Sequence, residues 1–348
     1  MQHRYFAASN SAEGFKNYFS EIFARADRLY VVKGGPGTGK SSLMKRFAER
    51  AKACGYALEY YYCSSDPSSL DGVLALNENY AVGMLDGTPP HSFEPTLPGA
   101  REQLVDLGQF WRSDILKKQK NEIFALSVKK GSAYKRAYTY LRSCGNLRAV
   151  IDSLLKKAIF EDKLISVAEK SVGALQLKPG KANCTPAILS AVSMNGESRL
   201  SSFDDAEIVY TVGDLYGVGG MFLDALKSEL VNTDAHLRVS YDAICPTHVD
   251  GIYVEDRRTA FVLSAGEGES EKSINPRRFV SKDIMREIRG EIRYAARLYS
   301  DCKDGALHAL GEAKIYHFLL EDIYRQSMDF SSLCEYADRL LEGEFGAE

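Results

Sequence analysis

Lys33-Gly34-Gly35-Pro36-Gly37-Thr38-Gly39-Lys40-Ser41-Ser42 is the most informative stretch of this chain. Its core fits Gly-x-x-x-x-Gly-Lys-Ser, the phosphate-binding loop or P-loop. An apolar run over residues 29–32 precedes it, and apolar residues at helical spacing between 43 and 51 follow it. A strand, a glycine loop and a helix in this order are the context that the motif requires. The sequence therefore predicts a nucleotide site here.

The residue types of this loop suit a bound triphosphate. Glycines let the backbone curl so that successive N–H groups point inward, and the helix that begins at Lys40 adds the positive end of its dipole. We expect Lys40 to reach the β- and γ-phosphates and the Ser41 hydroxyl to hold the accompanying Mg²⁺. A glycine-rich turn without a ligand is the alternative interpretation. The residues expected to bind the nucleotide are Gly34, Gly35, Pro36, Gly37, Thr38, Gly39, Lys40, Ser41 and Ser42.

Asp86 is the expected second ligand of the Mg²⁺, because it ends the apolar run 80–85. Strands that alternate with helices form a parallel sheet, and such sheets bind ligands at the carboxyl ends of their strands. Asp86 would thus lie opposite Ser41 and act in catalysis together with Lys40. The β-type run 58–63 between the loop and Asp86 is typical of the additional-strand P-loop ATPases rather than of nucleotide kinases. A turn aspartate before a glycine is the alternative.

The residue that would activate water is less clear from the pattern. Many ATPases carry a glutamate directly after the metal-binding aspartate, but this chain has Gly87 there. Nearby polar residues are candidates for orienting water or sensing the γ-phosphate. For His91 and Asp71 a loop hydrogen bond or a turn cap is the alternative role. The candidates are Asp66, Asp71, His91 and Glu94.

The composition bounds the class of protein. A length of 348 residues suits two domains, and 45% hydrophobic with 26% charged residues is normal for a soluble globular protein. The net charge of −3 gives the whole molecule no attraction to nucleic acid or anionic membrane. Seven cysteines without Cys-x-x-Cys pairs suggest neither a zinc ribbon nor a disulfide framework. No apolar run has the length of a membrane span, so we expect a cytoplasmic protein without a membrane partner.

Further elements follow from hydrophobic periodicity. Residues 4–8 are typical of a short strand, and apolar residues between 15 and 23 repeat at helical spacing. Long helices are expected from about 98 to 170. Ten Lys or Arg but only two acidic residues lie between 112 and 148, with aromatic residues interleaved. This basic segment is a candidate contact for nucleic acid or a protein partner, and a solvated helix face is the usual alternative.

The chain contains an internal repeat, which predicts a tandem duplication. At an offset of 180, Gly37 aligns with Gly217; at an offset of 179, Asp71 aligns with Asp250. We therefore expect two halves, 1–175 and 185–348, each of which includes its own helical extension. The further aligned pairs are Tyr30 with Tyr210, Val32 with Val212, Gly39 with Gly219, Leu43 with Leu223, Glu49 with Glu229, Tyr62 with Tyr241, Pro67 with Pro246, Gly72 with Gly251 and Ala81 with Ala260.

The second copy lacks the chemistry of the first. Lys40 aligns with Gly220, Ser41 with Met221 and Asp86 with Ala265, so the phosphate-binding cation and both Mg²⁺ ligands are missing. We expect one working nucleotide site, in the first half. The second half would complete the sheet or cap the site. Arginines that could supply a charge to the first site, or lie exposed on the surface, are Arg257, Arg258, Arg277 and Arg278.

Several stretches together resemble a group of bacterial ATP-binding proteins, an ATPase family built of two tandem P-loop NTPase-like halves. The likeness is close over roughly the first 150 residues and looser afterwards. It implies ATP as the nucleotide and an α/β P-loop fold in each half. The stretches are Arg4-Tyr5-Phe6-Ala7, the loop Lys33 to Ser42, Cys63-Ser64-Ser65-Asp66, Ser69-Leu70-Asp71-Gly72 and Asp86-Gly87-Thr88-Pro89-Pro90-His91.

The sequence thus predicts an α/β P-loop NTPase, tandemly duplicated, with a parallel sheet and flanking helices in each half. The expected function is Mg²⁺-dependent binding and slow hydrolysis of ATP by the first half. A phosphotransferase that moves the γ-phosphate to a small molecule is one alternative. A nucleotide-sensing switch or scaffold without turnover is another, and an ATPase stimulated by nucleic acid is a third. Base preference and oligomeric state stay open.

Overall fold

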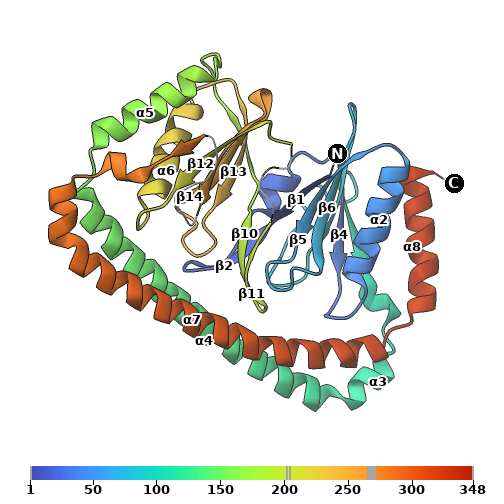
Figure 1. Ribbon diagram of the computed structural model, residues 1–348. Helices are drawn as coiled ribbons and strands as arrows, with labels where there is room; N and C mark the ends of the chain where they lie inside the picture. The colour runs from blue at the N-terminus through green and yellow to red at the C-terminus, as the bar shows by residue number, and fades with distance from the viewer. Residues whose placement is uncertain (1, 201–202, 204, 265–271, 347–348) are drawn as a thin grey trace.

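The structure is a computed structural model that describes residues 2–200, 203, 205–264 and 272–346. Two six-stranded sheets with flanking helices lie side by side, and each forms an α/β unit (Figure 1). The first sheet has the order β1 (Gln2–Phe6), β5 (Ala57–Tyr62), β6 (Leu70–Leu76), β7 (Ala81–Asp86), β4 (Arg28–Lys33) and β8 (Glu102–Asp106). The second has the order β9 (Asn183–Pro186), β13 (His236–Tyr241), β14 (Val249–Val254), β15 (Thr259–Ser264), β12 (Ile208–Gly213) and β16 (Ser273–Ile274).

The two sheets have the same strand order and the same strand directions when each strand is matched to its counterpart, from β1 with β9 to β8 with β16. This agreement supports the predicted tandem duplication of two α/β domains. The prediction of a parallel sheet is only partly right, because β6 and β14 run antiparallel to both of their neighbours. The short connections before and after these strands contain no crossover helix, and hairpin connections impose antiparallel pairing.

Strand β6 changes the position of Asp86 in the sheet. It lies between β5 and β7, so the strand β7 that carries Asp86 pairs directly with β4, and Val32 is the register partner of Asp86. The expectation from the chain order, an additional strand between the loop strand and the acid, is therefore wrong. The run 58–63 is indeed β5, but it lies farther along the sheet.

A small hairpin follows the first strand of each unit. The first consists of β2 (Ala8–Ser11) and β3 (Gly14–Asn17), the second of β10 (Ser190–Ser193) and β11 (Gly196–Arg199). The helix expected over residues 15–23 is therefore confined to α1 (Phe19–Phe23). Gly14, at a φ of 98°, turns the chain between β2 and β3, and the Ser11 hydroxyl donates a hydrogen bond to its carbonyl.

One helix follows the glycine-rich turn of each half: α2 (Lys40–Ala53) in the first and α6 (Val218–Leu230) in the second. The apolar face of α2 packs on β5, β6 and β7, while Phe23 of α1 contacts the other face of this sheet at Gly72 and Gly83. Short 3-10 turns are η1 (Leu107–Phe110), η2 (Glu255–Arg257) and η3 (Pro276–Phe279).

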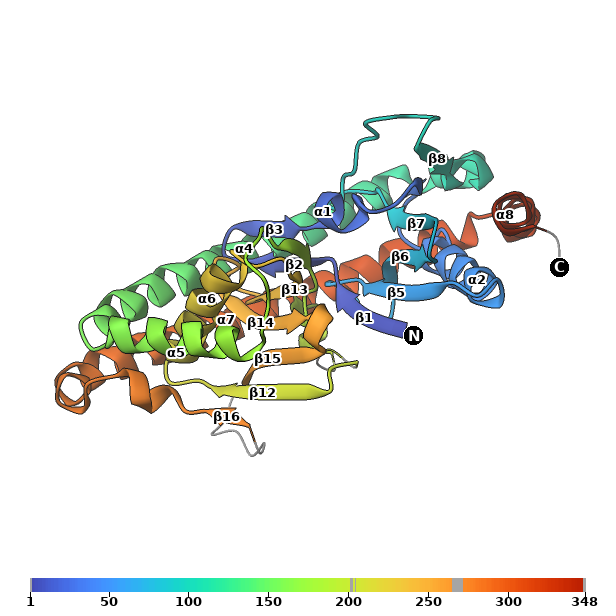
Figure 2. The ribbon, with the colours of Figure 1, turned by 90° about the horizontal axis from the view of Figure 1, so that it is seen from above.

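Two long helices run below both sheets. After α3 (Ser113–Lys118), helix α4 (Lys120–Lys156) extends from the first sheet to the second, and α7 (Lys282–Gln326) returns beside it in the opposite direction (Figures 1 and 2). The expected helical region 98–170 thus contains one exception, the edge strand β8.

The helices that end these extensions are exchanged between the halves. Helix α5 (Glu161–Ala174) packs on α6 of the second half, and α8 (Phe330–Phe345) packs on α2 of the first (Figure 1). Leu333, Ala337 and Leu341 of α8 belong to the core of the first sheet, and Leu164 and Ala168 of α5 belong to the core of the second. Each core therefore needs a helix from the other half of the chain.

Within the described residues, no helix is both long enough and apolar enough to serve as a membrane span.

Candidate functional site

The turn between β4 and α2, residues 34–39, is called the glycine loop here. Gly37 and Gly39 have φ angles of 70° and 89°, in the left-handed region that only glycine adopts without strain. Gly39 is the N-cap of α2, so the first free N–H groups of this helix point toward the loop. Curled backbone and a helix N-terminus together give this turn a positive concave side.

Lys40 and Asp86 meet at this turn, as the sequence predicts. Lys40 Nζ donates hydrogen bonds to the carbonyl oxygens of Gly34 at 3.0 Å and Gly35 at 2.7 Å, and it lies 3.6 Å from Asp86 Oδ2. Asp86 also accepts from the Thr88 N–H at 2.8 Å. Both charged side chains are mostly buried. Two neighbouring strand ends therefore bring a cation and a carboxylate to one point.

The remaining predicted residues of the loop differ in their hydrogen bonds and in whether they line a cavity. Ser41 Oγ accepts a hydrogen bond from the Leu70 N–H at 3.0 Å and faces the same cavity as Lys40. Thr38 is buried, and its hydroxyl donates to the Gly35 carbonyl at 2.8 Å. Gly34 and Gly35 contribute carbonyls to Lys40 instead of lining the cavity. The predicted loop residues that do line it are Pro36, Gly37, Thr38, Gly39, Lys40, Ser41 and Ser42.

The glycine loop forms one wall of a cavity of about 660 Å³, called the first cavity below. The opposite wall comes from α4 and α7, which the sequence pattern did not connect with this site. Only the basic segment 112–148 gave a signal, since Lys130 lies in it. The added lining residues are Lys130, Tyr134 and Tyr138 of α4, His317, Glu321 and Arg325 of α7, and Met194 of the turn between β10 and β11.

The charges of this wall favour an anionic ligand. Burial lowers the pKa of Lys130, and Lys40 lowers it further. Burial, followed by Lys130, also lowers the pKa of His317 to about 4. Arg325 lines the cavity beside them, whereas burial raises the pKa of Glu321. Lys130 and Arg325 thus place positive charge on this wall, which a bound anion would stabilise.

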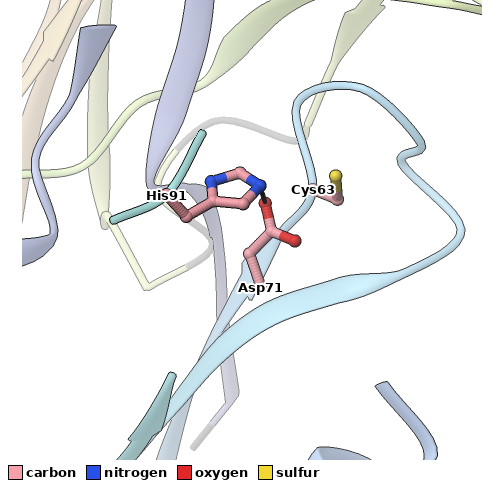
Figure 3. Close-up of side chains that lie close together, drawn as sticks. All are labelled: Cys63, Asp71 and His91. Atoms are coloured by element: carbon pink, nitrogen blue, oxygen red, sulfur yellow. Dashed lines mark ion pairs between the residues drawn. The ribbon is translucent and has the colours of Figure 1, made fainter. Parts of the chain in front are cut away.

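Three of the four candidates for orienting water line the first cavity: Asp66, Asp71 and His91. His91 Nε2 lies 3.3 Å from Asp71 Oδ2, and both side chains are buried (Figure 3). Burial raises the pKa of Asp71 to about 6, although His91 opposes this shift and Asp86 adds to it. Glu94 points away, with 85% of its side chain exposed and its carboxylate 3.8 Å from Lys33 Nζ.

Cys63 is a residue near this pair whose role the sequence did not suggest. It follows β5 and lines the first cavity, and its thiol lies beside Asp71 and His91 (Figure 3). Ligand atoms of these three residues are all within 4.8 Å of one another. The gaps of eight and twenty residues between them match no familiar metal-binding spacing, so only the fold brings them together.

In the corresponding turn of the second half, the side chain of Asp214 binds the main-chain N–H groups. Asp214 aligns with Gly34, and its Oδ1 accepts hydrogen bonds from the N–H groups of Gly217 at 2.9 Å and Gly219 at 3.1 Å. Helix α6 begins at Val218, two positions before the residue that aligns with Lys40. A carboxylate thus takes the main-chain donors that a phosphate would need.

A second cavity of about 510 Å³ lies beside this turn, and Arg148, Arg199 and Lys303 are among its lining residues. The strand register corrects two aligned pairs. Ala260 is the partner of Val209, as Gly83 is of Leu29, so Ala260 corresponds to Gly83 and not to Ala81. Leu263 is the partner of Val212, as Asp86 is of Val32. Leu263 is therefore the counterpart of Asp86. Ala265, which the ungapped alignment placed there, lies outside the described residues.

The four arginines predicted to supply a charge do not line the first cavity. Arg257 donates to the carbonyls of Leu175 and Gln176, and Arg258 pairs with Glu207. The basic segment is partly used within the molecule, since Arg136 pairs with Glu312 and Arg148 with Asp152. Arg277 and Arg278 are the other two of the four arginines that do not line the first cavity.

Comparison of the chain with models of protein families, with curated proteins and with solved structures found no match. What can be said of its function comes from the two cavities and from the pattern of the glycine loop.

Proposed function

We propose that the first half binds Mg²⁺·ATP at the glycine loop and hydrolyses it slowly, and that the second half is catalytically inactive. The proposal rests on one observation. Lys40 Nζ and Asp86 Oδ2 lie 3.6 Å apart beside the glycine loop, where helix α2 begins. These groups have the residue types and the setting of a P-loop site. A cavity of about 660 Å³ is large enough for a nucleotide.

In this proposal the chain's own residues share the work of binding. Lys40 exchanges its contacts with the Gly34 and Gly35 carbonyls for contacts with phosphate oxygens, and the N–H groups of the loop position those oxygens. Ser41 and Asp86 would hold the Mg²⁺, and the bound ion would neutralise charge on the phosphates. Lys130 and Arg325, on the facing helices, add positive charge to the same cavity.

Slow turnover follows from the missing glutamate after Asp86. Asp71 and His91 are the buried polar pair that faces the cavity, and the raised pKa of Asp71 suits a group that takes up a proton near neutral pH. Neither occupies the position directly after the metal-binding acid. We therefore expect weaker activation of water than in ATPases that carry a carboxylate there.

The Lys40→Ala variant tests nucleotide binding. Because a hydrogen bond to a charged group is worth ~1.5–3 kcal/mol, ATP affinity should fall by about 10- to 100-fold. The matched control is Lys303→Ala, which removes a lysine of the second cavity that pairs with Glu197 at 2.9 Å. Titration calorimetry should show wild-type affinity for the control. Equal affinities of wild type and Lys40→Ala would refute the proposal.

Transfer of the γ-phosphate to a small acceptor is the second candidate function, and two observations favour it. The acid-bearing strand β7 pairs directly with β4, which is the arrangement that the nucleotide kinases share. The first cavity also extends past the loop to Tyr134 and Tyr138, which leaves room for an acceptor. A product assay separates the functions: free phosphate from ATP alone indicates hydrolysis, and dependence on an added acceptor indicates transfer. Tight binding without either product would indicate a nucleotide switch.

A further inference from the structure

Cys63, Asp71 and His91 form a cluster at the edge of the first cavity, and the nucleotide proposal gives no role to Cys63 or to the three residues as a group. They come from the end of β5, from β6 and from the loop after β7 (Figure 3). The thiol, the carboxylate and the imidazole each offer one ligand atom, and these atoms all lie within 4.8 Å of one another. Three different donor types from separate segments thus converge on one point.

Hydrogen bonding accounts for only part of this convergence, since a side-chain hydrogen bond links Cys63 and Asp71. Among the described residues, Asp71 Oδ2 is buried without a hydrogen-bond partner, although it lies only 3.3 Å from His91 Nε2. The two groups are thus within contact distance but lack the alignment of a hydrogen bond. Buried polar atoms that remain unsatisfied are costly and call for an explanation such as an unoccupied ion site.

We propose that Cys63 Sγ, Asp71 and His91 Nε2 bind a Zn²⁺ ion. Zinc accepts sulfur, nitrogen and carboxylate oxygen together, whereas Mg²⁺ prefers oxygen alone. Tetrahedral bonds of ~2.0–2.3 Å place neighbouring ligand atoms roughly 3.3–3.8 Å apart. The His91–Asp71 separation of 3.3 Å already fits this spacing, and the thiol needs only a small inward rotation or shift.

The position of the cluster gives the ion a role at the cavity. Three protein ligands leave the fourth position open, which is the arrangement of zinc sites that bind water or substrate. All three residues line the first cavity, so this fourth position faces the space beside Lys40 and Asp86. The proposed role at the nucleotide rests on the proposed function, but metal binding itself does not.

The second half provides a built-in comparison. At the offset of 179, Asp71 corresponds to Asp250, which is also buried, while Cys63 corresponds to Asp242. Asp250 Oδ2 accepts a hydrogen bond from the Ser190 hydroxyl at 2.9 Å, while its Oδ1, like Asp71 Oδ2, is buried without a partner among the described residues. The second half has thus kept the buried acid but has no thiol at the position of Cys63. Zinc should bind only in the first half.

The test is a Zn²⁺ titration of the full chain with Mg²⁺ in excess and no nucleotide, read by metal analysis after dialysis. Wild type should retain one Zn²⁺ per chain, and Cys63→Ser and His91→Gln should weaken binding by about tenfold or more. Matched controls are Asp250→Asn, the counterpart acid, and Cys54→Ser, which changes an exposed thiol. Both should bind like wild type.

Co²⁺ provides a second readout, because a thiolate ligand gives an intense sulfur-to-metal charge-transfer band. This band should appear in wild type and be absent from Cys63→Ser. Thermal unfolding checks that each variant is folded. Zinc bound equally by wild type and both cluster variants, or no zinc bound by wild type, would overturn the proposal. Lys40→Ala should lose ATP affinity and keep Zn²⁺, so failure of the nucleotide site and failure of the metal site are distinguishable.

Discussion

The two glycine turns have similar backbone conformations but differ in one side chain. Both glycine turns place a glycine in the left-handed region, with Gly37 at 70° and Gly217 at 111°. In the first half, a glycine at position 34 leaves the main-chain donors free. In the second, Asp214 fills them with its own carboxylate. We propose that one acid at the position of Gly34 opposes phosphate binding, because a carboxylate and a phosphate would compete for one set of donors.

The Asp86→Asn variant tests the metal role at this scale. Mg²⁺ should strengthen ATP binding to wild type by about tenfold or more, that is by ~1.4 kcal/mol, and this dependence should disappear in the variant. Asp66→Asn, a change of another carboxylate that lines the first cavity, is the control and should keep the dependence. Affinity is measured with Mg²⁺ and with a chelator. A variant that still responds fully to Mg²⁺ would remove Asp86 from the metal site.

At the scale of elements, helix α7 closes the outer side of the glycine loop. A Cβ atom built on Gly37 would lie 2.8 Å from Glu321 Cγ, and closer still to the Glu321 carbonyl oxygen, which is main chain and cannot rotate away. Tyr324 of the same helix lies beside Gly35. The loop and α7 therefore fit each other only while position 37 is glycine.

Comparison of Gly37→Ala with Gly55→Ala isolates this contact. Gly55 has a φ of 83°, but a Cβ atom added to it would have no heavy atom within 4 Å, so alanine there should cost only the backbone strain of about 1–2 kcal/mol. At Gly37 the clash with α7 should add roughly 1–3 kcal/mol and lower ATP affinity. Denaturant unfolding measures both. Equal losses in the two variants would show that α7 does not constrain the loop.

Some elements of this fold could be predicted from the sequence, and others could not. The glycine loop, α2 and Asp86 could be predicted because each depends on local residue types. Strand β6 was missed because Leu70-Asp71-Gly72 contains an acid and a glycine, which are typical of turns. The facing residues Lys130 and Arg325 could not be predicted, because only the pairing of α4 with α7 brings them to the first cavity. In the same way, only the fold brings Cys63, Asp71 and His91 together.

At the scale of the whole molecule, the two halves resemble the subunits of a twofold dimer. Equivalent positions of the first strands and hairpins meet: the Phe6 N–H donates to the Ile188 carbonyl at 2.8 Å, and Asn10 Nδ2 donates to the Val192 carbonyl at 2.7 Å. Contact between equivalent positions is the signature of twofold pairing. Covalent joining frees the two copies to differ, which a dimer of identical chains cannot do.

Glu59 and Arg238 are an example of such a difference between the two halves. They occupy equivalent positions in β5 and β13, 179 residues apart, and form a buried ion pair at 2.7 Å. Arg25 pairs with the same carboxylate. Glu59→Gln should lower the free energy of unfolding by ~3–5 kcal/mol, because it removes the fully buried negative charge that compensates Arg238 and Arg25. The control Glu255→Gln removes another partner of Arg238 whose side chain is 36% exposed, and should cost about 1 kcal/mol or less.

The pH dependence of this pair gives the last prediction. Burial alone would raise the pKa of Glu59, but Arg238 and Arg25 outweigh it and hold the pKa at about 2, below the ordinary value of 4.5. A carboxylate with a lowered pKa stabilises the fold above its unfolded pKa and loses this contribution as the pH falls toward its folded pKa. Wild type and Glu59→Gln should therefore differ most above pH 4.5 and converge below it. Denaturant unfolding at a series of pH values measures the difference, and a gap that stays constant on acidification would mean that the Glu59 charge does not join the halves.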